Sequence, residues 1–111
     1  MKRMRADLIA EIKTARDEAR IKAHAYMNLT IKKYDYWRAV SAVLTYDEAL
    51  AMFARATEHR IPAMAARAIA DFERAHDDDP TATERTLAIA DGRRDALASV
   101  ADWMRNEEGN R

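Results

Sequence analysis

The stretch of residues 1–44, MKRMRADLIAEIKTARDEARIKAHAYMNLTIKKYDYWRAVSAVL, contains neither proline nor glycine, and its apolar residues recur at helical spacing. As one continuous helix it would be roughly 60–65 Å long, since each residue adds about 1.5 Å. A compact domain of this size has a radius of gyration of only about 13 Å. The sequence therefore predicts that this helix either breaks or extends beyond its own domain and exposes an apolar stripe.

The first half of this stretch carries a narrow apolar seam with 4-3-4 spacing, surrounded mostly by charged residues. The seam consists of Leu8, Ile12, Ala15 and Ala19. Such spacing is typical of a coiled coil, in which a partner helix covers the seam. We therefore expect residues 1–22 to form a projecting amphipathic helical arm.

From Ala23 to Leu44 the apolar face is wider and includes tyrosine and tryptophan, which is typical of a helix buried in a bundle. Residues 23–108 are accordingly expected to form a helical bundle, and the whole chain to form a single domain. Between Tyr26 and Ile31 the helix propensity is weakest, and Asn28 is where we expect any break.

The composition predicts an all-α protein, a compact bundle of about four helices with an over-long N-terminal helix. The 111 residues include only two glycines and two prolines, and no stretch alternates like a strand. The chain has no cysteine, no signal-peptide pattern and no apolar run long enough for a membrane span. We therefore expect a soluble, cytoplasmic protein that does not enter a membrane.

Two capping boxes predict where later helices begin. One starts at Thr45 with Glu48 three residues later, and the other starts at Thr81 with Glu84. The helix from Thr45 is expected to run to about Arg60, where the nearby Pro62 ends or kinks it.

The next helix, expected to reach about His76, has alanines on a second face and is therefore predicted to lie centrally between two neighbours. Gly92 either allows close packing inside the last helix or ends a shorter one.

Charge is distributed unevenly although the net charge is zero. Residues 1–38 hold ten Lys/Arg and five Asp/Glu, giving +5, and the remainder holds nine Arg and fourteen Asp/Glu, giving −5. The two parts could complement each other within a chain or head-to-tail between chains. Alternatively, the basic helix meets an acidic partner or nucleic acid.

A cluster of cations and aromatic residues within the first helix is the candidate for nucleic-acid contact. Its residues are Lys22, Lys32, Lys33, Tyr36 and Arg38. Aromatic rings beside cations can bind single-stranded nucleic acid. The alternative is that Tyr34 and Trp37 are core residues, with Lys33 along the tryptophan ring.

Arg93 interrupts the apolar stripe of the last helix. A buried arginine is costly without a partner, so we expect it to pair with Asp71 or Glu48, or to meet a protein partner.

Motifs for catalysis, cofactors and metals are incomplete. Glu73 and His76 form a single Glu-x-x-His, whereas carboxylate-bridged metal sites need two copies with further glutamates. The acidic run before Pro80 lacks the glycine and the glutamate of a calcium loop. The sequence therefore predicts no catalytic, cofactor-binding or metal-binding residues, and a protein that is not an enzyme.

The sequence favours a protein-protein interaction module that self-associates, as a dimer, or docks a partner through the N-terminal helix. The expected contact residues are the seam Leu8, Ile12, Ala15 and Ala19, together with Arg93. Its size and its Ala/Arg/Asp-rich composition also fit a small phage- or plasmid-type protein that binds and modulates a host protein. The alternative is a nucleic-acid-associated regulatory protein that uses the basic N-terminal helix.

Overall fold

The computed structural model describes residues 5–77 and 81–109, with the backbone alone for 106–109. The described residues are all-α, as predicted, and contain no strand. The elements are α1 (Arg5–Tyr26), η1 (Thr30–Lys32), α2 (Lys33–Ala54), η2 (Glu58–Arg60), α3 (Ile61–Asp77) and α4 (Glu84–Gly109).

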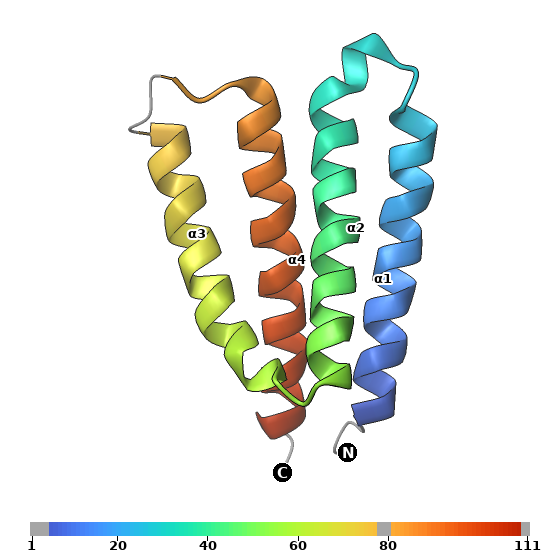
Figure 1. Ribbon diagram of the computed structural model, residues 1–111, viewed down its shortest axis with the longest axis vertical. Helices are drawn as coiled ribbons and strands as arrows, with labels where there is room; N and C mark the ends of the chain where they lie inside the picture. The colour runs from blue at the N-terminus through green and yellow to red at the C-terminus, as the bar shows by residue number, and fades with distance from the viewer. Residues whose placement is uncertain (1–4, 78–80, 110–111) are drawn as a thin grey trace.

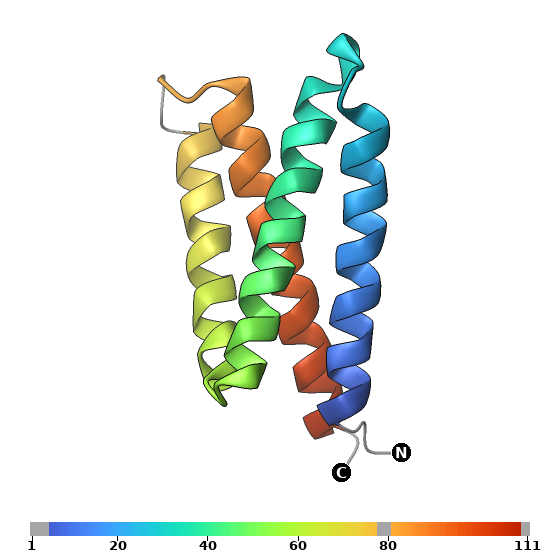
Figure 2. The same cartoon turned by 45° about the vertical axis from the view of Figure 1, so that its right-hand side comes forward.

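The four long helices lie side by side in the order α3, α4, α2, α1 (Figures 1 and 2). Their three extensive interfaces are α1 with α2, α2 with α4, and α4 with α3, whereas α1 touches α4 only sparsely. The central helices are therefore α2 and α4. The prediction that the helix following Pro62 is central is wrong, since α3 lies at the edge and its Ala63, Ala66 and Ala70 are exposed.

The long N-terminal stretch breaks at the position expected, around Asn28. The backbone N–H of Leu29 donates to the Tyr26 carbonyl at 3.0 Å, and that of Lys32 to the Leu29 carbonyl at 2.9 Å, which turns the chain back on itself. The two halves form a hairpin of α1 and α2, so the described residues do not contain the over-long first helix that was predicted.

The prediction of a projecting arm over residues 1–22 is wrong for residues 5–22, the part of it that the structure describes. Because α1 folds back along α2, the seam that was expected to meet a partner is covered within the chain: Leu8 is 4% exposed and Ile12 is fully buried. Burying an aliphatic side chain contributes about 1.5–3 kcal/mol, which favours this arrangement over one that leaves both in water. Arg5 and Arg16 reinforce it through ion pairs with Glu58 and Asp47.

The first capping box does not begin a helix. Thr45 is buried inside α2, and its hydroxyl donates to the Ser41 carbonyl four residues earlier at 2.8 Å. This bond satisfies the hydroxyl within a continuous helix, so the local cap pattern is overridden by packing.

The end of α2 is set by a left-handed residue, Ala56, with φ of 57°. The N–H of Thr57 donates to the Met52 carbonyl at 2.8 Å and that of Ala56 to the Phe53 carbonyl at 3.2 Å, the pattern of a Schellman motif. The helix thus ends at Ala54, earlier than predicted, and Pro62 lies in the first turn of α3, where its missing N–H costs nothing.

The second cap lies two residues later than predicted. The Thr83 hydroxyl oxygen accepts the N–H of Thr86 at 3.1 Å, so Thr83 rather than Thr81 caps α4. Asp79, whose residue type also favours the N-cap position, lies outside the described residues.

Large core residues gather at one end of the molecule. They come from the beginnings of α1 and α3 and the ends of α2 and α4. The buried cluster is Leu8, Ile12, Ala49, Phe53, Ile61, Ala65, Ala68, Leu97 and Val100. These helix ends all lie at the pole that carries both termini, while the α1–α2 turn lies at the opposite pole (Figure 1). The turn therefore has no large core to pack against.

Gly92 lies inside α4, which confirms close packing as the reason for the glycine. A Cβ atom at this position would overlap the Arg38 carbonyl oxygen and come within 3.0 Å of the Ser41 Cβ. A backbone carbonyl cannot rotate away, so a larger side chain at this position would push the two helices apart. Gly92 therefore allows α2 and α4 to approach this closely.

Gly92→Ala is expected to lower the free energy of unfolding by about 1–3 kcal/mol through overpacking. Helix propensity alone would give the opposite sign, a gain of about 1 kcal/mol. Urea denaturation decides between them, with exposed Ala70→Gly as a control that measures the propensity effect alone. Equal or greater stability of Gly92→Ala would show that α2 and α4 do not touch here.

Ala56→Gly is expected to raise the free energy of unfolding by about 1 kcal/mol, because glycine adopts the left-handed conformation without the Cβ penalty. The same substitution at Ala54, the last residue of α2, should instead lower stability. Thermal and urea unfolding of both variants check this opposite pair of signs, and destabilisation by both would contradict it.

Candidate functional site

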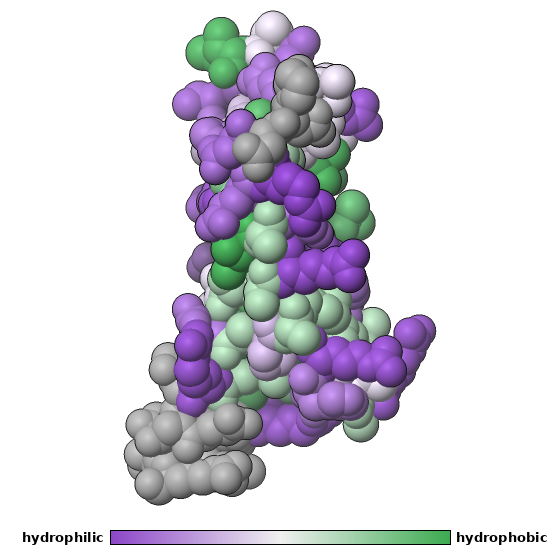
Figure 3. Space-filling view, turned by 90° about the vertical axis from the view of Figure 1, so that its left-hand side faces the viewer, coloured by the Kyte–Doolittle hydropathy of each residue, from purple (hydrophilic) through white to green (hydrophobic). Residues whose placement is uncertain are grey.

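The turn between α1 and α2 exposes large apolar side chains to solvent. The exposed fraction is 69% for Ile21, 51% for Met27, 48% for Leu29 and 90% for Ile31. Strongly hydrophobic surface is visible at the corresponding upper pole in Figure 3. We call these four residues, with Arg20, Lys22, Lys32 and Lys33 beside them, the hairpin tip.

The local sequence explains why the hairpin tip is not folded inward. The 3-10 turn of Thr30–Lys32 begins without a side-chain cap and alternates apolar with polar residues. A hollow of about 130 Å³ at this turn is lined by Tyr26, Met27, Leu29 and Tyr36 among others. The large core residues are at the other end of the bundle. Apolar side chains here therefore remain in water.

The hairpin tip is also positively charged. From residue 19 to residue 34 the chain has four Lys/Arg and no Asp or Glu. Two of these cations lie near flanking acids, Arg20 at 3.9 Å from Asp17 and Lys32 at 3.6 Å from Asp35. Both pairs are exposed, and such pairs contribute little to stability. The hairpin tip thus combines exposed apolar groups with a local excess of cations.

Most of the residues predicted to contact nucleic acid line two hollows, Lys22 and Arg38 a hollow between α1 and α4, and Lys33 and Tyr36 a hollow at the α1–α2 turn. Lys22, Lys32 and Lys33 are exposed around the turn. Tyr36, however, lies edge-on to Trp37 with ring centroids 5.0 Å apart, and Arg38 is directed toward α4.

The ring of Trp37 is covered by Arg85, whose guanidinium lies 4.0 Å from the ring centroid, rather than by Lys33. Both rings of the Tyr36–Trp37 pair therefore have a packing role.

The residues predicted to bind a partner are used inside the chain. Leu8 and Ile12 belong to the core and Ala19 is buried, while Ala15 is half-buried.

Arg93 bonds Glu48 at 2.8 Å, which is one of its two expected partners. Asp71, the other candidate, lies beside Arg67 and Arg74.

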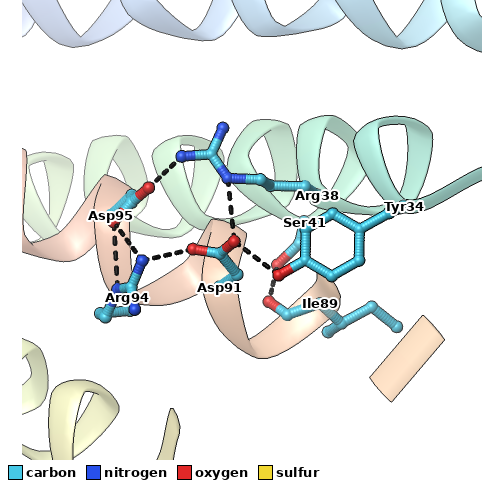
Figure 4. A network of polar contacts seen from close by, with 7 residues as sticks. All are labelled: Tyr34, Arg38, Ser41, Ile89, Asp91, Arg94 and Asp95. Carbon is cyan, nitrogen blue, oxygen red and sulfur yellow. Dashed lines mark hydrogen bonds and ion pairs between the residues drawn. The ribbon is translucent and has the colours of Figure 1, made fainter. Parts of the chain in front are cut away.

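A polar network that sequence reasoning missed joins α2 to α4 next to Gly92 (Figure 4). Its centre is Asp91, only 9% exposed, whose carboxylate accepts the Tyr34 hydroxyl at 2.7 Å and lies 3.2 Å from Arg38 Nε. Arg94 also pairs with Asp91, and both arginines pair with Asp95.

Nearby, the Ser41 hydroxyl donates to the Ile89 carbonyl at 2.6 Å. The network holds α2 and α4 together. In the sequence, the glycine beside Asp91 was the one indication that two helices approach each other here.

Two hollows lie along the helices. One, of about 480 Å³, lies between α1 and α4 with α2 as its floor. The other, of about 440 Å³, lies between α3 and α4 and is lined by Pro62, Ile69, Met104 and alanines. Figure 3 shows pale green, weakly hydrophobic residues gathered in the lower half of the α3 side, bordered by purple hydrophilic residues.

The described residues contain no group of three or more His, Cys, Asp or Glu side chains placed to hold a metal ion. Among the same residues, none of the helices combines the length and apolar character needed to cross a membrane.

Tyr34→Phe tests the polar network. Burial, then the hydrogen bond to Asp91, raises the pKa of Tyr34 to about 12 from its ordinary 10.0. The neutral phenol is thus favoured in the folded state, so its contribution is complete below about pH 10 and is lost as the pH rises through about 12. We expect the variant to be less stable by about 1 kcal/mol at neutral pH, with the difference shrinking over that interval.

Urea denaturation across this pH range measures the difference, and the absorbance of ionised tyrosine follows the titration itself. Tyr36→Phe is the matched control and should change stability by less than about 0.5 kcal/mol. A difference that stays constant or grows with pH would contradict the role given to the Tyr34 hydroxyl.

Comparison with protein-family models, with curated proteins and with solved structures gave no match to this chain.

Proposed function

We propose that this chain is a non-enzymatic interaction module that binds its partner through the hairpin tip. The observation that carries the proposal is the exposure of Ile31, Ile21, Met27 and Leu29 around one turn. Single exposed apolar residues are common on proteins, but a group of large ones at one pole is typical of a contact surface. The proposed contact surface is therefore at the C-terminal end of α1 and not at the N-terminal seam of this helix, which the fold covers.

Energetics support this choice. Complete burial of an aliphatic side chain contributes about 1.5–3 kcal/mol, so a partner covering even part of this group gains several kcal/mol before the costs of association. The folded chain itself gains nothing from leaving these side chains in water. The cations of the hairpin tip would speed its encounter with an acidic partner surface and select against a basic one.

A nucleic-acid-associated regulatory role is the second candidate, favoured by the four cations between residues 19 and 34. Against it, four large apolar side chains are exposed beside those cations, and phosphate groups gain nothing from them. Arg38 is also engaged by Asp91 and Asp95.

A cytoplasmic location fits the absence of cysteine, and a phage- or plasmid-type protein acting on a host protein is a special case of the proposed role.

A photo-crosslinking residue at Met27 tests the proposal in cells that express the full chain. We expect a discrete protein adduct that disappears when Leu29→Ser and Ile31→Ser are added, because the exposed apolar group is then lost. The crosslinker at Arg67, which lies on α3 with its side chain 86% exposed, is the control and should give no such adduct.

Unchanged thermal unfolding of the serine variant shows that loss of the adduct is not loss of folding. Equal adducts at Met27 and Arg67, or none at Met27, would overturn the proposal. An adduct that nuclease treatment removes would replace it with the nucleic-acid candidate.

A further inference from the structure

The hollow at the α1–α2 turn has large apolar and aromatic residues in its lining. They are Tyr26, Tyr36, Met27 and Leu29, of which Met27 is 51% and Leu29 48% exposed. The volume of this hollow is about 130 Å³. An apolar cavity of about 150 Å³ in another protein holds a benzene molecule. The hollow at the turn therefore has the size and the lining to accept part or all of one large apolar side chain.

The rest of the lining is polar and contains no carboxylate. It consists of Asn28, Thr30 and Lys33, and all three residues are exposed. Within the part of the chain that the structure describes, none of these three side chains forms a hydrogen bond or an ion pair. An amide, a hydroxyl and an ammonium group can all donate hydrogen bonds. Donors without a neighbouring acid complement a carboxylate, which accepts such bonds strongly.

Cations are present on both sides of the turn. Lys22 lies on α1 before it, and Lys33 is the first residue of α2 after it. Neither lysine forms an ion pair with another described residue, and residues 19 to 34 contain no Asp or Glu. The other two cations of the hairpin tip already lie near flanking acids. The two lysines are therefore the cations that an acidic partner would meet.

We propose that the partner of the hairpin tip presents an acidic segment of chain, whose one large apolar side chain occupies the hollow at the turn. This inference rests on the proposed function and names the chemistry of the partner. The apolar side chain would cover the exposed parts of Met27 and Leu29, and carboxylates before and after it would meet Lys22 and Lys33. A free C-terminus fits less well, because its carboxylate supplies negative charge on one side of the apolar residue only.

Other anionic partners match fewer of these features. A phosphate backbone would meet the lysines, but its bases have polar edges, for which Met27 and Leu29 offer no hydrogen bond. An anionic lipid surface would meet Ile31, which at 90% is the most exposed of the large apolar residues, and it brings no fixed side chain to the hollow. The acidic segment alone uses both the lysines and the hollow.

The test is isothermal titration calorimetry of the full chain with three short synthetic peptides. The first has one leucine with aspartates on both sides, the second has serine in place of the leucine, and the third has asparagines in place of the aspartates. We expect the leucine peptide to bind, and the serine peptide to bind more weakly on the order of 10-fold, because the buried leucine is lost. The asparagine peptide should also bind more weakly, and added salt should reduce its difference from the leucine peptide.

Two matched pairs of variants locate the bound peptide. Leu29→Ser should weaken binding of the leucine peptide, whereas Leu44→Ser, at an exposed leucine of α2, should not. Lys33→Gln should weaken the leucine peptide and leave the asparagine peptide unchanged, whereas Lys13→Gln, at an exposed lysine within α1, should leave both unchanged. Unchanged thermal unfolding of the variants shows that weaker binding is not loss of folding.

No measurable binding of the leucine peptide, equal binding of the serine peptide, or equal losses in variants and controls would each overturn the acidic segment. Tighter binding of a single-stranded oligonucleotide or of phosphatidylserine vesicles would replace it with a phosphate-bearing partner. A protein adduct at Met27 without peptide binding would overturn the acidic segment and leave the proposed function intact. An absent Met27 adduct would instead overturn the proposed function itself.

Discussion

The close contact between α2 and α4 determines the position of every other element. Gly92 allows the Arg38 carbonyl to approach the backbone of α4, and the Asp91 network fixes the two helices at that point. The outer helices then pack on this central pair, α1 on α2 and α3 on α4. A bulkier residue at the contact would displace both outer helices together, since each takes its place from the helix next to it.

The arrangement also divides the molecule along its length. Large side chains from all four helices meet at the pole with the termini, whereas the sides toward the opposite pole are lined by alanine, as in the hollow between α1 and α4. Apolar residues near the α1–α2 turn consequently find no core of their own. The basic, apolar hairpin tip is therefore a consequence of where the bundle places its core.

Features that depend on a single residue were predictable from the sequence. Which helix faces pack against each other was not. The all-α class, the break near Asn28, close packing at Gly92 and the bond from Arg93 to Glu48 each follow from one residue type in one position. The seam at Leu8 and Ile12 is different, because the same 4-3-4 spacing serves a partner helix from another chain or from the same chain. Thr45 shows the same ambiguity, since its hydroxyl can cap a helix or bond inside one. The hairpin tip was missed because its exposure depends on which helices lie beside it, and periodicity does not encode that.

The helices α1 and α4 begin and end, respectively, at the pole opposite the α1–α2 turn (Figure 1). A bead, a sensor surface or a fused fluorescent protein joined at either end would therefore hold the molecule by its core and present the basic, apolar turn outward. Immobilising the protein through either terminus would therefore leave the candidate contact surface accessible.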